Sequence, residues 1–242
     1  TTTQKVIVQD TTKPTITPPA DITQEATSSD SNTVSLGKAD ASDLVEIATV
    51  SNDAPSKFKL GETIVSWTAT DSSGNIANVT QKVTIIDTSS PNISKPDNVV
   101  VEATSKTDTV VTLQPPIATD SVSKVTITND APKTFPLGDT LVTWTAKDEA
   151  GNRSNVTQTI TIKDSTAPEL AIPDNVITNA TDLNTVISFG NANATDLTDS
   201  SPKITNDAPD AFPIGETKVT WTVVDSFGNM ESKTQTRKIG RA

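Results

Sequence analysis

A nine-residue pattern that recurs at a fixed spacing constrains this chain more than any other feature. It begins with tryptophan and ends with Gly-Asn, as WTATDSSGN from Trp67, WTAKDEAGN from Trp144 and WTVVDSFGN from Trp221. Each copy lies 77 residues after the previous one. Self-similarity at a fixed period is the signature of an array of similar structural units. The 242-residue chain is therefore predicted to contain three domains, although its length alone suggests one or two.

The repeated pattern is typical of a β-hairpin. Before the turn, apolar Val142, Trp144 and Ala146 alternate with polar residues, which is the period of a strand with one buried face. Asp148 opens the turn, because its carboxylate can accept hydrogen bonds from later backbone N–H groups. Gly151 supplies the positive φ of a bulged hairpin loop. The tryptophan, as the largest apolar group of each repeat, is expected at the centre of a core.

The composition favours an all-β fold, because threonine and serine are abundant, 15 prolines are present and helix-favouring runs are missing. A unit of 77 residues buries only about 60–65% of its unfolded surface, so each unit is expected to be modestly stable. About seven short strands per repeat are typical of a Greek-key sandwich. In the first repeat we expect strands at residues 22–26, 32–36, 46–50, 63–70 and 79–86.

The repeat boundaries follow from the closing strand. Residues 1–10, TTTQKVIVQD, match residues 78–87 and 155–164, so the chain opens with the closing strand of a preceding or partner repeat. Proline follows each boundary after four residues, and it stiffens a short linker. We therefore expect three tandem immunoglobulin-like β-sandwich repeats of about 77 residues that form a rod, spanning residues 11–87, 88–164 and 165–242.

The third repeat departs from the pattern in two places. Phe189 falls one residue short of the register of the other repeats, and an insertion at residues 197–202 restores it. Arg237 stands where Val83 and Ile160 point inward. Because a buried arginine is costly, the closing strand of the third repeat is expected to be weaker than the other two.

Several functional classes are disfavoured by what the chain lacks. Without cysteine it has no disulfide scaffold, cysteine-based zinc site or thiol nucleophile, and without histidine it lacks the commonest general base. A net charge of −11 argues against binding nucleic acid or an anionic membrane surface. No apolar run approaches the roughly 18 residues of a membrane span. Serine and lysine occupy alternating positions that indicate a solvated face, so we expect no enzymatic activity.

Further motifs repeat together with the hairpin. Each repeat has a lead-in Asp and Pro, then NDAP, then FKLG, FPLG or FPIG before the tryptophan pattern, and a closing strand. Together they resemble the HYR (hyalin repeat) domain, an immunoglobulin-like family that is also similar to bacterial Ig-like surface repeats. The resemblance covers essentially the whole chain. It implies an extracellular repeat module associated with adhesion or cell-surface architecture, and it implies no catalytic residues.

Three sets of aspartates are the best candidates for a binding site. In an immunoglobulin-like sandwich the incoming linker, one loop and the final hairpin tip share a pole. Carboxylates that converge there repel one another unless a cation or protons intervene, and Ca²⁺ accepts about six to eight oxygen ligands. The alternative is that each aspartate only caps its own turn. The sets are Asp10, Asp43 and Asp71; Asp87, Asp120 and Asp148; and Asp164, Asp196 and Asp225, with Glu25 and Glu102 as weaker candidates.

Six Asn-X-Ser/Thr triplets are candidate glycosylation sites. The alternative is that they arise by chance in a chain rich in threonine and asparagine. They begin at Asn78, Asn92, Asn152, Asn155, Asn179 and Asn193.

The leading functional hypothesis is a structural repeat module of an extracellular or cell-surface protein, such as a rod, stalk, surface layer or filament, stiffened by Ca²⁺ at the repeat junctions. The alternative is an adhesin that binds carbohydrate or protein through exposed loops. Tyrosine and histidine are absent and each tryptophan is in a predicted strand, which favours the first hypothesis. Protein partners or self-association are expected in either case.

The opening segment supports a third hypothesis. By register, Val6 and Val8 are an inward-facing pair that has no domain of its own. Either the chain is part of a longer array, or this strand completes a neighbouring molecule by strand addition. The third repeat is the candidate recipient, because Arg237 weakens its closing strand. Head-to-tail donation of this kind would propagate as a filament.

Overall fold

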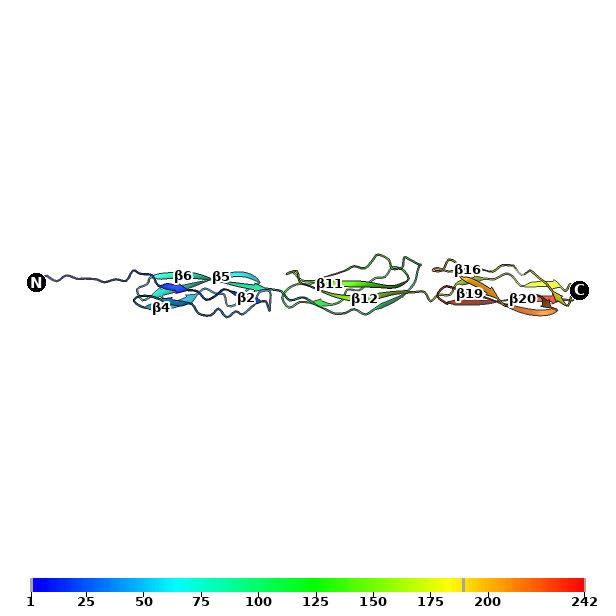
Figure 1. Cartoon of the computed structure of the whole chain (residues 1–242), viewed down its shortest axis with the longest axis horizontal. Helices are drawn as coiled ribbons and strands as arrows, with labels where there is room; N and C mark the ends of the chain where they lie inside the picture. Colours follow the sequence, from blue (N-terminus) through cyan, green and yellow to red (C-terminus); the bar gives the residue numbers. More distant parts are fainter. Residues whose placement is uncertain (1, 189, 242) are drawn as a thin grey trace. The chain divides into compact units, whose positions relative to one another are not determined.

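The computed structural model describes residues 2–188 and 190–241, and every regular element within them is a β-strand. The prediction of an all-β chain with three similar repeats is confirmed, since a long hairpin and its flanking strands recur three times (Figure 1). Phe189, which the sequence places out of register, lies outside the described residues.

The first repeat has a four-stranded sheet and a two-stranded sheet. Its strands are β1 (Thr15–Thr17), β2 (Ile22–Glu25), β3 (Asp40–Ser42), β4 (Ile47–Asn52), β5 (Gly61–Asp71) and β6 (Ile76–Ile86). The larger sheet has the order β2-β6-β5-β4, and β1 pairs with β3. β5 and β6 form a long antiparallel hairpin, whereas β2 runs parallel to β6.

The second repeat follows the same plan. Its strands are β7 (Asn92–Ile93), β8 (Val99–Glu102), β9 (Ala118–Thr119), β10 (Thr126–Asn129), β11 (Gly138–Lys147) and β12 (Arg153–Lys163). The four-stranded sheet has the order β10-β11-β12-β8, and β7 pairs with β9. As in the first repeat, the early strand β8 lies parallel to the closing strand β12.

The third repeat adds a short third sheet. Its strands are β13 (Glu169–Ala171), β14 (Val176–Asn179), β15 (Asn184–Thr185), β16 (Asn193–Thr195), β17 (Lys203–Asn206), β18 (Phe212–Pro213), β19 (Gly215–Val224) and β20 (Met230–Gly240). The main sheet has the order β14-β20-β19-β17, while β13 pairs with β16 and β15 with β18. β14 is again parallel to β20.

The hairpin has the conformation that its sequence predicts. Val142, Trp144 and Ala146 are all at most 3% exposed, and Gly151 adopts a φ of 102°. The tryptophans of the other two repeats are equally buried. The prediction that each tryptophan lies in a core is therefore confirmed.

Each buried indole is held by a glutamine that the sequence reading missed. Trp67 Nε1 donates to Gln81 Oε1 at 3.1 Å, and Gln81 Nε2 donates in turn to the backbone carbonyls of Ala20 and Leu36. Gln81 is completely buried. The same bond, at 3.0 and 3.1 Å, recurs 77 and 154 residues later. Thus in the first repeat a polar bridge joins the hairpin core to the segments before and after β2.

The strand predicted at residues 32–36 is wrong, because only an isolated bridge between Asn32 and Phe58 forms there. The Asn32 side chain accepts from the N–H groups of Thr27 and Ser28 and donates to the carbonyls of Ser28 and Phe58. Such local bonds compete with a strand ladder. The apolar side chains of this segment nevertheless pack against the core.

The other predicted strands of the first repeat are present with shifted ends. The sequence reading missed β1 and β3, which are only three residues long and therefore carry too little periodicity to be recognised. The lead-in proline lies directly before β1 and does not enter the sheet. Strands as short as these show too few alternating residues for a pattern to predict them.

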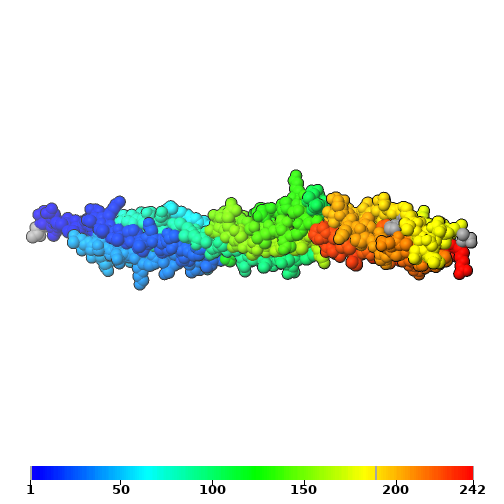
Figure 2. Space-filling view, turned by 45° about the vertical axis from the view of Figure 1, so that its right-hand side comes forward, coloured from blue at the N-terminus to red at the C-terminus, as the bar shows by residue number. Residues whose placement is uncertain are grey.

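The opening segment forms no strand within the described residues, and its side chains lie at the surface (Figure 2, dark blue). Val6 is 76% exposed and Val8 is 94% exposed. The longer-array and strand-donation hypotheses both stay predictions.

Arg237 is fully buried, as its inward register predicts, and its Nη2 donates to Gln235 Oε1 at 2.9 Å. β20 is nevertheless complete, with 11 residues, as many as β6 or β12. It pairs with β19 from Gly215 to Val224 and with β14. In the third repeat, β20 therefore already occupies the position of the closing strand, and this position is not open to a donated strand.

We predict that Gln81→Leu lowers the free energy of unfolding of the first repeat by about 2–3 kcal/mol, because the buried Trp67 N–H and two partly buried carbonyls lose their partner. Urea unfolding followed by hydrogen exchange of peptides from β5 and β6 measures this. The control Thr80→Val changes an exposed neighbour and is expected to stay within about 0.5 kcal/mol of the parent chain. Equal effects of the two variants would contradict the prediction.

Candidate metal sites

The structure brings together two of the three predicted aspartate sets, at the start of the first and third repeats. In two sets, one carboxylate oxygen from each residue lies within 4.8 Å of the others, namely Asp10 with Asp43 and Asp71, and Asp164 with Asp196 and Asp225. In the middle set, burial and then the negative charges of Asp120 and Asp148 raise the pKa of Asp87. Each set thus concentrates negative charge where the linker enters.

Each aspartate also caps a turn, as the alternative interpretation predicts, and the role in metal binding stays a prediction. Asp71 Oδ1 accepts from the N–H groups of Ser73 and Asn75, and Asp43 Oδ1 accepts from Val45 N–H. The lead-in residue Asp10 likewise uses Oδ1. Capping therefore fixes the orientation of each carboxylate. In Asp10 it uses Oδ1 and leaves Oδ2 without a role in the turn.

The second oxygen of two lead-in aspartates has no donor. Oδ2 of Asp10 and Oδ2 of Asp87 are both buried, and no described residue donates a hydrogen bond to them. A buried carboxylate oxygen without a partner is costly, especially beside other carboxylates. A cation would remove that cost, so the donor set at these two positions fits a hard metal ion such as Ca²⁺.

The third set satisfies the equivalent oxygen internally. The Thr198 hydroxyl donates a hydrogen bond to Asp164 Oδ2, and both residues are buried. The Thr198 hydroxyl oxygen also lies 3.0 Å from Asp196 Oδ1. In the third set a threonine hydroxyl therefore donates to Oδ2 of the lead-in aspartate, whereas in the first two sets no described residue donates to this oxygen.

The environment of two hairpin-tip aspartates, Asp71 and Asp148, favours the ionised form despite their burial. Burial raises the pKa of Asp71, but hydrogen bonds from Asn75, Ser73 and Gly74 outweigh it, so the pKa is lowered overall. The pKa of Asp148 is lowered in the same way. These carboxylates consequently keep the negative charge that a cation site needs.

An asparagine at each hairpin tip ties the acids to the linker. Asn75 Nδ2 donates to Asp71 Oδ2 at 2.7 Å and to the backbone carbonyl of Asp10 at 3.3 Å. Asn152 and Asn229 make the equivalent two bonds in the other repeats. In the sequence, the recurrence of this asparagine at the 77-residue period is the one signal of its role at the linker.

Glu25 and Glu102, which the sequence could not place, each hold the next linker. Glu25 accepts from the N–H and hydroxyl of Thr88 and from the hydroxyl of Ser89, at 2.8 to 2.9 Å. Its negative charge also contributes to the raised pKa of Asp87. Glu102 accepts three equivalent bonds from Ser165 and Thr166. Both glutamates therefore belong to the junctions between repeats.

Comparison with known proteins identifies the repeats. The HYR domain model matches three successive segments, residues 9–85, 86–162 and 163–237. The chain belongs to the HYR domain family. The resemblance that the motifs indicated is thereby confirmed.

Two sea urchin hyalins are among the relatives of these HYR repeats. Hyalin of Lytechinus variegatus is 32% identical over 186 residues, which cover 72% of this chain and 35% of that protein. Hyalin of Strongylocentrotus purpuratus is 31% identical over 211 residues, which cover 81% of this chain and 18% of that protein. The chain thus spans about a third or less of the length of these relatives. Among solved structures, domains EC22–24 of mouse cadherin-23 align over 95% of this chain and 99% of theirs, with 13% identity and a TM-score of 0.38.

The glycosylation candidates of the HYR repeats differ in accessibility. Asn152 is half-buried and its amide donates to Asp148 and to the Asp87 carbonyl, so a glycan there would break the linker tether. The other five asparagines are exposed and stay candidates, namely Asn78, Asn92, Asn155, Asn179 and Asn193.

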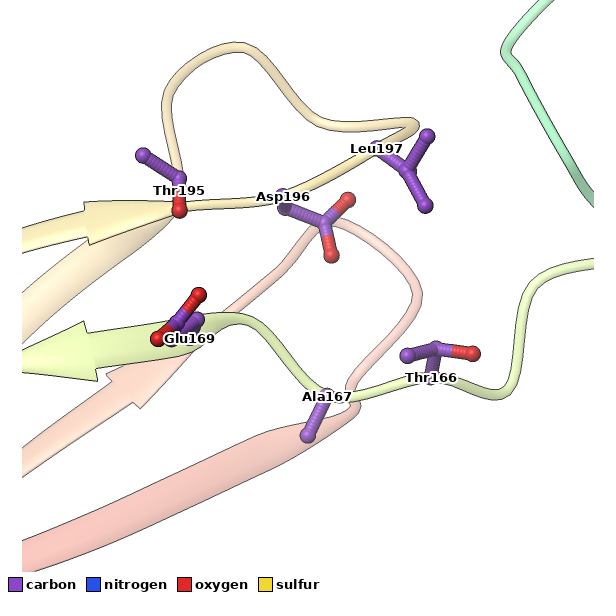
Figure 3. Close-up of a pocket in the computed structure, with 6 residues that line it drawn as sticks. All are labelled: Thr166, Ala167, Glu169, Thr195, Asp196 and Leu197. Atoms are coloured by element: carbon purple, nitrogen blue, oxygen red, sulfur yellow. The ribbon is translucent and has the colours of Figure 1, made fainter.

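A small hollow of about 320 Å³ adjoins the third acidic set. Figure 3 shows Asp196 and Leu197 on the segment after β16, opposite Thr166 and Ala167 on the segment that enters β13. Glu169 and Thr195 complete the lining.

No stretch of the described chain forms a helix of the length and apolarity that a bilayer crossing requires.

We predict that the linker contact of Glu25 is lost in acid. Hydrogen bonds from Thr88 and Ser89 hold the pKa of Glu25 below its ordinary value of 4.5. The contact therefore stabilises the junction above that value and weakens as the pH falls through the lowered pKa. The protection of the Thr88 amide from exchange, followed by NMR from about pH 6 to about pH 3, should fall accordingly.

Variants separate this effect from general acid sensitivity. Glu25→Ala should remove the protection of the Thr88 amide at every pH. Glu62→Gln removes a carboxylate whose ion pair with Lys82 is exposed, and should leave Thr88 unchanged. Protection in the parent chain that does not vary with pH would show that Glu25 contributes nothing to the linker.

Proposed function

We propose that this chain is a structural repeat module of an extracellular or cell-surface protein, in which bound Ca²⁺ stiffens the junctions between HYR repeats. The observation that carries the proposal is the arrangement around each lead-in aspartate. Its backbone carbonyl accepts from the hairpin asparagine, and for Asp10 and Asp87 two further acids add negative charge beside the carboxylate while no described residue donates to one of its buried oxygens.

The chemistry of the donor set supports a calcium-type ion. All side-chain ligands would be carboxylate oxygens, which hard cations prefer over softer transition metals. The residues that would hold the ion are Asp10, Asp43 and Asp71 in the first repeat, and Asp87, Asp120 and Asp148 in the second. A bound Ca²⁺ would neutralise the clustered charge and link the linker, loop and hairpin tip. Glu25 lies near enough to Asp87 to add its charge to the second set.

The junctions explain why the proposed role is structural. Side chains of the preceding repeat and of the following hairpin both hold the linker, through Glu25 to Thr88 and through Asn152 to the Asp87 carbonyl. Val122 of the second repeat is buried in the same apolar cluster as the core of the first. Bonds from both sides of a short linker restrict its bending, and an ion at the same place would restrict it further. We infer a stiff array of repeats without enzymatic activity.

The second candidate function, an adhesin, has one observation in its favour. The hollow lined by Asp196 places two acids, two threonines and two apolar side chains around one depression. A glycan array and cell-binding measurements on the intact chain test this role. Specific binding that Thr195→Arg abolishes would favour the adhesin over the purely structural module.

We predict that Ca²⁺ raises the unfolding midpoint of the parent chain, because the ion binds the native state alone. At a Ca²⁺ concentration of 100 times Kd the gain per site is about 2.7 kcal/mol. Asp87→Asn should abolish the gain of the second site, yet in EDTA it should leave stability unchanged or raised, because it removes one repelling charge. Calorimetry with Ca²⁺ and with EDTA measures both effects.

The matched control is Asp97→Asn, which changes an exposed aspartate and should retain the full response to Ca²⁺. Small-angle scattering should give a larger or more sharply defined maximum dimension with Ca²⁺ than with EDTA. Identical melting curves and identical scattering in the two conditions would mean that the aspartates act only as turn caps.

A further inference from the structure

One position in the loop of each repeat differs in a way that bears on the acidic sets. Val45, Val122 and Thr198 each lie two residues after the loop aspartate, and each donates its backbone N–H to that aspartate at 2.8 to 2.9 Å. Val122 and Thr198 are also equally buried, at 5% and 4% exposed, whereas Val45 shares the backbone contact but is 59% exposed. Only the third has a hydroxyl.

The hydroxyl coincides with the difference in the lead-in aspartates. Where the position is valine, Oδ2 of Asp10 or of Asp87 is buried and no described residue donates to it. Where the position is Thr198, its hydroxyl donates to the equivalent Oδ2 of Asp164. Thr198 is 4% exposed and Asp164 is 5% exposed, so water does not compete for this bond. One side-chain oxygen thus decides whether the carboxylate is satisfied by the protein.

We propose that the Thr198 hydroxyl takes the place of a cation at the third acidic set, so that the HYR repeats of one chain bind Ca²⁺ with graded affinity. The inference rests on the proposed function, because it assumes that the valine-containing sets bind Ca²⁺. An ion that enters the third set must break the bond between Thr198 and Asp164. The ion-free state of this set is therefore more stable, and its affinity for Ca²⁺ is lower.

Affinities of different sets cannot be compared directly, because the third set has an additional acid. Asp199 Oδ2 accepts a hydrogen bond from the N–H of Ser226 on the hairpin turn. The Asp199 carboxylate adds negative charge near Asp196. That charge attracts a cation and opposes the effect of the hydroxyl. The comparison has to be made within one set, by adding or removing the hydroxyl alone.

Two reciprocal substitutions provide this comparison. Thr198→Val should tighten Ca²⁺ binding at the third set about tenfold, and Val122→Thr should weaken it at the second set by a similar factor, as expected for one hydrogen bond to a charged group. NMR titration with CaCl₂ reads the sets separately, through the Ser226 amide for the third and the Gly151 amide for the second. Thr198→Ser keeps the hydroxyl and should match the parent chain.

The outcomes distinguish this inference from the proposed function. If the second set of the parent chain binds no Ca²⁺, the proposed function fails. If it binds Ca²⁺ but neither substitution changes an affinity, or Thr198→Val weakens binding because the hydroxyl is itself a ligand, this inference is wrong. In EDTA, Thr198→Val should also lower the unfolding midpoint, whereas the exposed control Thr195→Val should not. Should Thr198→Val fail to fold, Val122→Thr still decides.

Discussion

The hydrogen bonds of the asparagine at each hairpin tip connect the fold of a repeat to its junction. The Asn75 amide closes the turn through Asp71 and holds the incoming linker through the Asp10 carbonyl. This side chain therefore holds the backbone of the lead-in aspartate close to the hairpin-tip acid. The hairpin-tip asparagine thus stabilises the turn and holds the incoming linker next to the acidic set.

The sequence predicted the long hairpins, the buried tryptophans and the number of repeats, because a 77-residue period and a two-residue alternation are both visible in one chain. It did not predict that Gln81 would face inward, since a glutamine is usually read as a surface residue. The error at residues 32–36 has the same origin. Asn32 satisfies nearby backbone groups, and this local competition leaves no trace in an alternating pattern.

The candidate sites were predictable only in part. Topology suggested that linker, loop and hairpin aspartates meet, and the geometry places them together in the first and third sets. The role of Glu25 could not be predicted, because its partners are more than 60 residues away and depend on how one repeat follows another. The contrast between Val122 and Thr198 was equally hidden. A valine and a threonine have the same shape, and their difference matters only beside a carboxylate oxygen that needs a donor.

The parallel pairing of the first and last strands of each main sheet has a mechanical consequence. β2 runs beside β6 from Ile22 and Val83 onward, and β8 with β12 and β14 with β20 repeat the arrangement. A pulling force along the chain draws two such strands in opposite directions parallel to their axes. The hydrogen bonds between them are then loaded together in shear, rather than broken one after another as in unzipping a hairpin. Each repeat can therefore bear tension at its ends before its core opens.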